Sequence, residues 1–304
     1  MKRISITIVA AILCGAAFTA VCEAQTRIAL LDSKNTSDFF KAHYPACDPG
    51  INPPSYYMGA DEYQRYFRGW QRVLEQQGLA YEIIHDEDVT AAGLAPYKLL
   101  ILSNTALMSD AQTKAVHQWV IRGGRLLATF GSGYKSLAND PREADGWKEQ
   151  KGGTFGLHQL WHDPMGKVFS TWWIDPGVDV RITRYEGPTA LLKGKLKGDI
   201  LPYGGEGNIL VQRPEQHPNV LGFLQIENPD WKVTSPAIIS TRQAKGLVVY
   251  FAFAPEYIVY KELESSAIAQ EKGWPVCSEG NMWVGRSAEC QLLMIGALQY
   301  LLNN

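Results

Sequence analysis

The stretch Tyr97–Gly133, YKLLILSNTALMSDAQTKAVHQWVIRGGRLLATFGSG, contains the signals of a strand, a helix and a second strand in short succession. Ser109 and Gln112 form a capping box before the helix, and Gly123-Gly124 supplies the left-handed residue that ends it. The helix presents an apolar stripe, formed by Ala111, Ala115, Val116, Trp119 and Val120. With strands at Lys98–Ser103 and Arg125–Phe130, this unit predicts a right-handed crossover in an at least partly parallel sheet that is buried on both faces.

Elements on either side extend this pattern. Arg27–Leu31 and Ala80–Ile84 read as strands, and between them Asp32–Ala60 reads as a long loop before a helix over Asp61–Gln77. Toward the C-terminus, strands are expected at Val220–Gln225, Ala237–Thr241 and Leu247–Ala254, with a hairpin turn at Gln243–Gly246. The last helix is expected to begin at Ser287, with an apolar stripe formed by Cys290, Leu293, Met294, Ala297, Leu298 and Leu301.

The N-terminus has the pattern of a cleavable export signal. Lys2 and Arg3 precede the apolar run Ile4–Val21, and Ala24 is a small residue at which cleavage is plausible. We therefore expect residues 1–24 to be removed and residues 25–304 to form a periplasmic or secreted α/β domain that has no membrane anchor after cleavage. Three cysteines remain, and Cys290 is expected either to pair with Cys277 or to be a buried thiol, while Cys47 is a further candidate partner.

Composition narrows the classes of function. The chain has 29 basic and 31 acidic residues, and this near balance argues against a nucleic-acid-binding surface. The segment His158-Gln-Leu-Trp-His162-Asp163 has two histidines at helical spacing, but Pro164 ends it and the glutamate of a zinc-protease motif is missing. We expect neither a metal nor a cofactor.

Three segments resemble the β-galactosidase trimerisation domain, a branch of the class I glutamine amidotransferase-like (flavodoxin-like) fold. They are Tyr66–Asp88, Leu94–Gly133 and Ser235–Glu256. The resemblance implies a flavodoxin-like parallel sheet flanked by helices, here with a β-rich insertion at about residues 140–215, and a capacity to form homo-oligomers. We expect no catalytic barrel, because the domain begins directly after the export signal.

In a parallel α/β sheet, ligands bind beyond the carboxyl ends of the strands. That rule places Asp32–Ala60, Asn104–Met108, Phe130–Tyr134 and the segment after Ala254 around one crevice. Amidotransferases carry a cysteine on a sharp turn and a histidine near a carboxylate. Here the turn reads Phe130-Gly-Ser-Gly133, and Ala254-Pro-Glu256 carries only the acid, so the resemblance implies a fold without amidotransferase chemistry.

Two sets of residues are candidates for a site. A hydrolase would use Ser132 as nucleophile, or Glu206 and Glu256 as an acid pair, although no spacing pairs them. A carbohydrate site would use aromatic faces near the crevice, because flat rings with polar edges stack on sugars. The candidate ligand-binding residues are Tyr44, Tyr56, Tyr57, Ser132, Tyr134, Trp172, Trp173 and Glu256. The same rings could instead cover a small β layer.

The sequence therefore favours an exported, non-catalytic α/β domain that binds carbohydrate or mediates assembly in polysaccharide handling. A hydrolase acting on a glycan or ester and a structural envelope protein are the alternatives. The ligand, the oligomeric state and the disulfide pairing do not follow from the sequence.

Overall fold

A computed structural model describes the chain over residues 27–43, 60–133, 135–137, 147–149, 157, 160, 179–183, 201–204, 220–228, 231–263, 284–285 and 287–304. Its main sheet is ten-stranded and contains five neighbouring parallel strands. In spatial order these are β2 (Tyr81–Ile84), β1 (Ile28–Leu31), β3 (Leu99–Leu102), β5 (Arg125–Ala128) and β12 (Gly246–Phe251). The order reverses between β1 and β3, which makes that point the topological switch of the parallel part.

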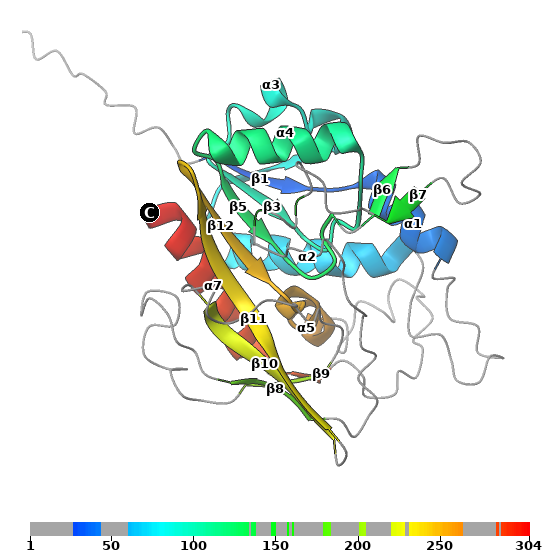
Figure 1. Cartoon of the computed structure of the whole chain (residues 1–304), viewed down its shortest axis with the longest axis vertical. Helices are drawn as coiled ribbons and strands as arrows, with labels where there is room; N and C mark the ends of the chain where they lie inside the picture. The colour runs from blue at the N-terminus through cyan, green and yellow to red at the C-terminus, as the bar shows by residue number, and fades with distance from the viewer. Residues whose placement is uncertain are drawn as a thin grey trace, which may run out of the picture.

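Antiparallel strands continue the same sheet beyond β12 (Figure 1). They are β11 (Trp231–Gln243), β10 (Val220–Asn228), β8 (Asp179–Thr183), β9 (Leu201–Gly204) and β13 (Val284–Gly285). The hairpin between β11 and β12 turns where the sequence predicts it, with Ala244 at a φ of 51°. From the expected β-rich insertion, β8 and β9 therefore join the main sheet as antiparallel strands.

Helices cover both faces of the parallel strands (Figure 1). One face is packed by α2 (Ala60–Gln76), α5 (Pro255–Leu263) and α7 (Ser287–Asn303), and the other by α3 (Ala91–Leu94) and α4 (Asp110–Ile121). Successive residues of each strand alternate between the two cores: Ile28 and Leu30 face α2, whereas Ala29 and Leu31 belong to the α4 side. This confirms a sheet that is partly parallel and buried on both faces.

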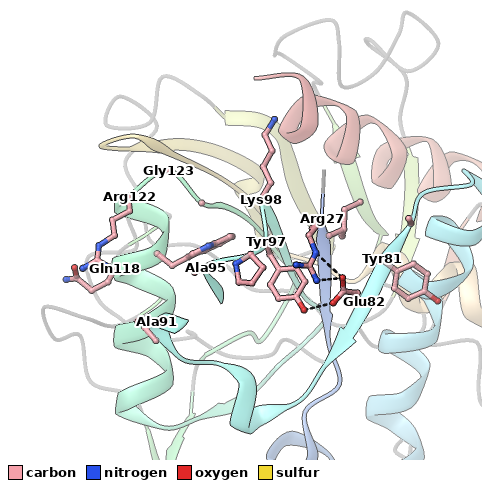
Figure 2. Close-up of a pocket in the computed structure, with 16 residues that line it drawn as sticks. Arg27, Tyr81, Glu82, Ala91, Ala95, Tyr97, Lys98, Gln118, Arg122 and Gly123 are labelled. Carbon is pink, nitrogen blue, oxygen red and sulfur yellow. Dashed lines mark hydrogen bonds and ion pairs between the residues drawn. The ribbon is translucent and has the colours of Figure 1, made fainter. Parts of the chain in front are cut away.

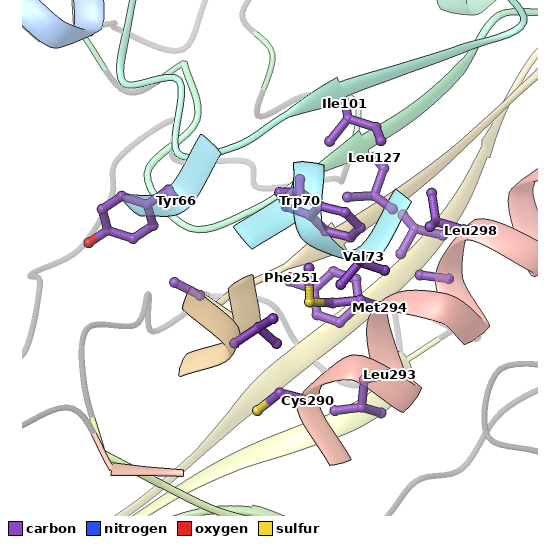
Figure 3. Close-up of a cluster of buried hydrophobic side chains, with 14 of the residues drawn as sticks. Tyr66, Trp70, Val73, Ile101, Leu127, Phe251, Cys290, Leu293, Met294 and Leu298 are labelled. Carbon is purple, nitrogen blue, oxygen red and sulfur yellow. The ribbon is translucent and has the colours of Figure 1, made fainter. Parts of the chain in front are cut away.

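The larger core lies between the sheet and helices α2, α5 and α7 (Figure 3). Trp70 of α2 is fully buried there beside Phe251 of β12 and Met294 of α7. Every residue of the apolar stripe expected for the last helix is buried. On α4, Val116, Trp119 and Val120 are buried as expected, but Ala111 is exposed and the polar Gln112 and Thr113 are buried instead.

The expectation of a loop over Asp32–Ala60 is wrong in its first part, because α1 occupies Lys34–His43. The Ser33 hydroxyl accepts a hydrogen bond from the Thr36 backbone N–H at 3.1 Å and so caps this helix. Phe39 and Phe40 are buried in a small third cluster with Tyr63 and Leu107. A second, three-stranded sheet lies nearby and is formed by β4 (Leu107–Met108), β6 (Lys135–Leu137) and β7 (Trp147–Glu149).

Candidate functional site

Polar side chains gather where the parallel strands end at their carboxyl edge. Ser103 and Asn104 follow β3, Thr129 and Ser132 follow β5, and Glu256 lies just beyond β12 in the first turn of α5. All five are buried, and we refer to them as the carboxyl-edge cluster. The sequence predicts Ser132 and Glu256 at this edge, and the structure brings both there. Ser103 and Thr129 were missed, although a hydroxyl directly after each of two buried strands was the available signal.

Glu256 is the central acid of the cluster and is 0% exposed. Its Oε1 accepts hydrogen bonds from the hydroxyl of Thr129 and, at 3.4 Å, from the hydroxyl of Ser103. Its Oε2 has no hydrogen-bond partner among the residues that the structure describes. Burial raises the pKa of this carboxyl to about 8, because desolvation outweighs the hydrogen bonds from Thr129 and Ser103 that favour the charged form. The group is therefore largely protonated at neutral pH.

Asn104 adds backbone strain at the same point. It has a φ of 42°, in the left-handed region, and both amide atoms of its buried side chain lack a hydrogen-bond partner among the described residues. Its backbone N–H donates to the Thr129 hydroxyl at 3.0 Å. Asn104 and Glu256 are therefore the two cluster members whose side chains have spare hydrogen-bonding capacity among the described residues. Strained residues and unsatisfied buried polar groups concentrate at functional sites, which makes these two the candidates for contact with a ligand.

Ser132 lies in a tight turn between Gly131 and Gly133, which have φ values of 77° and 70°. Its hydroxyl donates to the Leu102 carbonyl at 3.1 Å and accepts from the Thr105 backbone N–H at 3.3 Å. The side chain is 3% exposed, and in the described part of the chain no histidine is hydrogen-bonded to it. This geometry fastens the turn after β5 to the end of β3, and among the described residues the hydroxyl has no hydrogen-bonded base of the kind that activates a serine nucleophile.

A second polar network borders the cluster beside β1. The Asp86 carboxylate accepts from the Ser33 hydroxyl at 2.9 Å and from the Asn35 backbone N–H at 2.8 Å. Burial raises the pKa of Asp86, against the effect of these hydrogen bonds. The Tyr63 hydroxyl donates to the Leu31 carbonyl at 2.9 Å and accepts from the Ser33 N–H at 2.8 Å. These contacts join the end of β1 to α1 and α2 and immobilise this side of the carboxyl edge.

A cavity of about 790 Å³ lies at the opposite edge, where the parallel strands begin. Arg27, Glu82 and Tyr97 form a hydrogen-bonded group in its lining, and Gln118 and Arg122 belong to the lining on α4, with their side chains directed away from that group (Figure 2). Glu82 accepts from Arg27 Nε at 3.0 Å and from the Tyr97 hydroxyl at 2.8 Å. The rule of ligand binding beyond the carboxyl ends did not anticipate this cavity, because helix and loop placement around the strand starts creates it.

The remaining candidate residues cannot be placed at either edge. Tyr44, Tyr56, Tyr57, Tyr134, Trp172, Trp173 and Glu206 lie outside the described residues, as do Cys47, Cys277 and the expected export signal. Cys290 is buried on α7. Within the described ranges, no group of three or more His, Cys, Asp or Glu side chains could hold a metal ion. Of the helices in that same part of the chain, none combines the length and apolarity needed to cross a membrane.

Comparison with known proteins gives structural neighbours only. No family model matches the chain, and no curated protein matches it. Gan42B, a GH42 beta-galactosidase from G. stearothermophilus, aligns with a TM-score of 0.52 and 18% identity over 79% of this chain. The chain spans 30% of the length of that enzyme. A ThuA-like protein from Bacteroides uniformis aligns with a TM-score of 0.51 and 13% identity, covering 91% of both chains. At these identities the likeness establishes a shared α/β fold.

Proposed function

We propose that the chain is an exported, non-catalytic α/β domain that binds carbohydrate or mediates assembly in polysaccharide handling. We further propose a flavodoxin-like fold related to the β-galactosidase trimerisation domain. The parallel strands support this fold. When the five of them are numbered by their order along the chain, their spatial order in the sheet is 2-1-3-4-5, which is the flavodoxin-like order. The neighbour Gan42B is described as a GH42 beta-galactosidase, which supports a link to carbohydrate.

The observation that carries the non-catalytic part is the state of Ser132. Its hydroxyl is buried and engaged in two hydrogen bonds to the backbone, so attack on a substrate would require the hydroxyl to give up both and become accessible. The open cavity lies instead at the amino edge, where side chains with hydrogen-bonding and stacking surfaces are accessible. Binding without turnover fits this distribution better than hydrolysis at the carboxyl edge.

Affinity electrophoresis through gels containing neutral and acidic polysaccharides tests the binding half, and light scattering tests assembly. We expect retardation by at least one polysaccharide or a mass above that of a monomer. A protein that is retarded by none and scatters as a monomer would remove both halves of the proposal. A structural envelope protein would show self-association alone.

A hydrolase is the second candidate, and the raised pKa of Glu256 favours it. A carboxylic acid that holds its proton at neutral pH is suited to general-acid work, and perturbed pKa values gather in active sites. This alternative requires that Glu256→Gln and Ser132→Ala each abolish turnover of a glycan or ester while the fold is retained. Turnover that is equal in the wild type and both variants would dismiss it.

A further inference from the structure

We propose that the cavity at the amino edge binds a saccharide that carries a carboxylate, such as a uronic acid unit. This inference rests on the proposed carbohydrate-binding function and names its site and its ligand class. The cavity is lined by residues from the starts of β1, β2 and β3 and by the facing sides of α3 and α4. Its volume of about 790 Å³ falls within the range of small-molecule sites.

Aromatic rings give the cavity a rigid apolar wall. Trp119 is 8% exposed and lies directly on Gly124, where an added Cβ would approach the indole ring to 2.3 Å. Tyr97 supplies a further ring at the start of β3, whereas the Tyr81 ring packs on the α2 side of the sheet, where its hydroxyl accepts from Gln71 and donates to Glu75. Rings held by backbone contacts lose little conformational entropy on binding, and their faces suit the apolar faces of sugar rings.

Polar groups in the cavity lining are held in place before any ligand arrives. Arg27 and the Tyr97 hydroxyl both donate to the Glu82 carboxylate, and the guanidinium also lies over the Tyr97 ring at 5.2 Å. The hydrogen bond from Arg27, which has the larger effect, and the hydrogen bond from Tyr97 lower the pKa of the Glu82 carboxyl. The carboxylate therefore stays charged and keeps the Arg27 and Tyr97 donors aligned. Gln118 lines the same cavity and offers a donor and an acceptor to sugar hydroxyls.

Positive charge at this edge argues for an acidic sugar over a neutral one. Arg27, Lys98 and Arg122 line the cavity, whereas Glu82 is the carboxylate among the lining residues and is engaged by Arg27. Burial and the charge of the neighbouring Arg125 lower the pKa of Lys98. A ligand carboxylate beside Lys98 would offset this repulsion.

One of these cations is held by the last helix, because the Lys98 ammonium donates to the Leu302 carbonyl at 3.4 Å. Figure 2 shows Lys98 directed toward α7 and Arg122 on the α4 side of the cavity. Lys98 and Arg122 thus lie at different parts of the lining, toward α7 and on α4, and an acidic oligosaccharide that crosses the cavity would meet both.

Isothermal titration calorimetry with trigalacturonate, and with galactotriose as its neutral counterpart, tests the proposal. We expect trigalacturonate to bind at least tenfold more tightly than galactotriose and its affinity to fall as salt is raised. The variants Arg122→Glu and Lys98→Glu exchange exposed cations and should each weaken binding by about tenfold or more, as expected when a charge-assisted contact is lost. Lys41→Glu, at an exposed position of α1 beyond the carboxyl edge, is the matched control and should leave binding unchanged.

The outcomes separate this inference from the proposed function. Equal affinity for the two oligosaccharides, or binding that Arg122→Glu and Lys98→Glu leave intact, would overturn the inference while carbohydrate binding survives. Failure of trigalacturonate to bind would also overturn it, and affinity electrophoresis and light scattering would still decide the broader proposal. Circular dichroism of each variant establishes that the fold is retained.

Discussion

Replacing Glu256 with glutamine should remove a large part of the pH dependence of stability. The buried carboxyl has a folded-state pKa of about 8, compared with 4.5 for an ordinary glutamate. Between these two values the folded protein binds more protons than the unfolded chain does. Stability therefore falls as the pH rises through this window, and below it the effect vanishes. Glutamine has a similar shape, keeps an acceptor for Thr129 and Ser103, and cannot ionise.

The size of the effect follows from the shift. Each pKa unit corresponds to about 1.4 kcal/mol, so the full window amounts to roughly 5 kcal/mol and the part reached by pH 7 to roughly 3 kcal/mol. A typical domain is stable by about 5–15 kcal/mol, which makes this a substantial fraction. Any constant cost of burying the glutamine amide is the same at every pH and cancels from the comparison.

Urea unfolding followed by tryptophan fluorescence at pH 5 and pH 9 measures this difference. The free energy of unfolding of Glu256→Gln, relative to that of the wild type, should rise by several kcal/mol between the two pH values. Glu87→Gln, which neutralises an exposed carboxylate, is the control and should show a far smaller change. If the difference between Glu256→Gln and the wild type were the same at both pH values, the reasoning about burial would be refuted.

Three further substitutions test the packing that forms the two edges. Tyr63→Phe should lower the free energy of unfolding by about 1–3 kcal/mol, because the Ser33 N–H and the Leu31 carbonyl lose their buried partner; an unchanged urea midpoint would contradict this. Ser109→Ala should cost about 1 kcal/mol through loss of the cap on α4, measured by thermal unfolding against the exposed substitution Ala111→Ser. Gly69→Ala should lower the free energy of unfolding by about 1–3 kcal/mol or more, because the added Cβ would lie 2.1 Å from the Glu256 carbonyl oxygen and would force α2 away from α5. A variant as stable as the wild type in urea would show that the two helices can separate freely.

The crossover unit was predictable because its signals are local. The capping box of Ser109 and Gln112 forms within one turn, and Gly123, at a φ of 120°, follows the end of α4 as expected. Helix α1 was missed because its cap at Ser33 is reinforced by Asp86, and the two residues are far apart in the sequence. The location of the cavity was missed for a similar reason, since Arg27, Glu82 and Tyr97 come from separate strand starts.

By itself the sequence determined which segments become buried strands and amphipathic helices, because hydrophobic periodicity and caps act over a few residues. It also determined that Ser132 and Glu256 end up at the same edge of the sheet, since both follow parallel strands. Only the tertiary structure decided what that edge can do. Burial by segments that are distant in the sequence raises the pKa of Glu256, and the same packing brings the Ser132 hydroxyl into hydrogen bonds with the backbone. At the other end of the sheet, the positions of α3 and α4 beside the strand starts create the cavity.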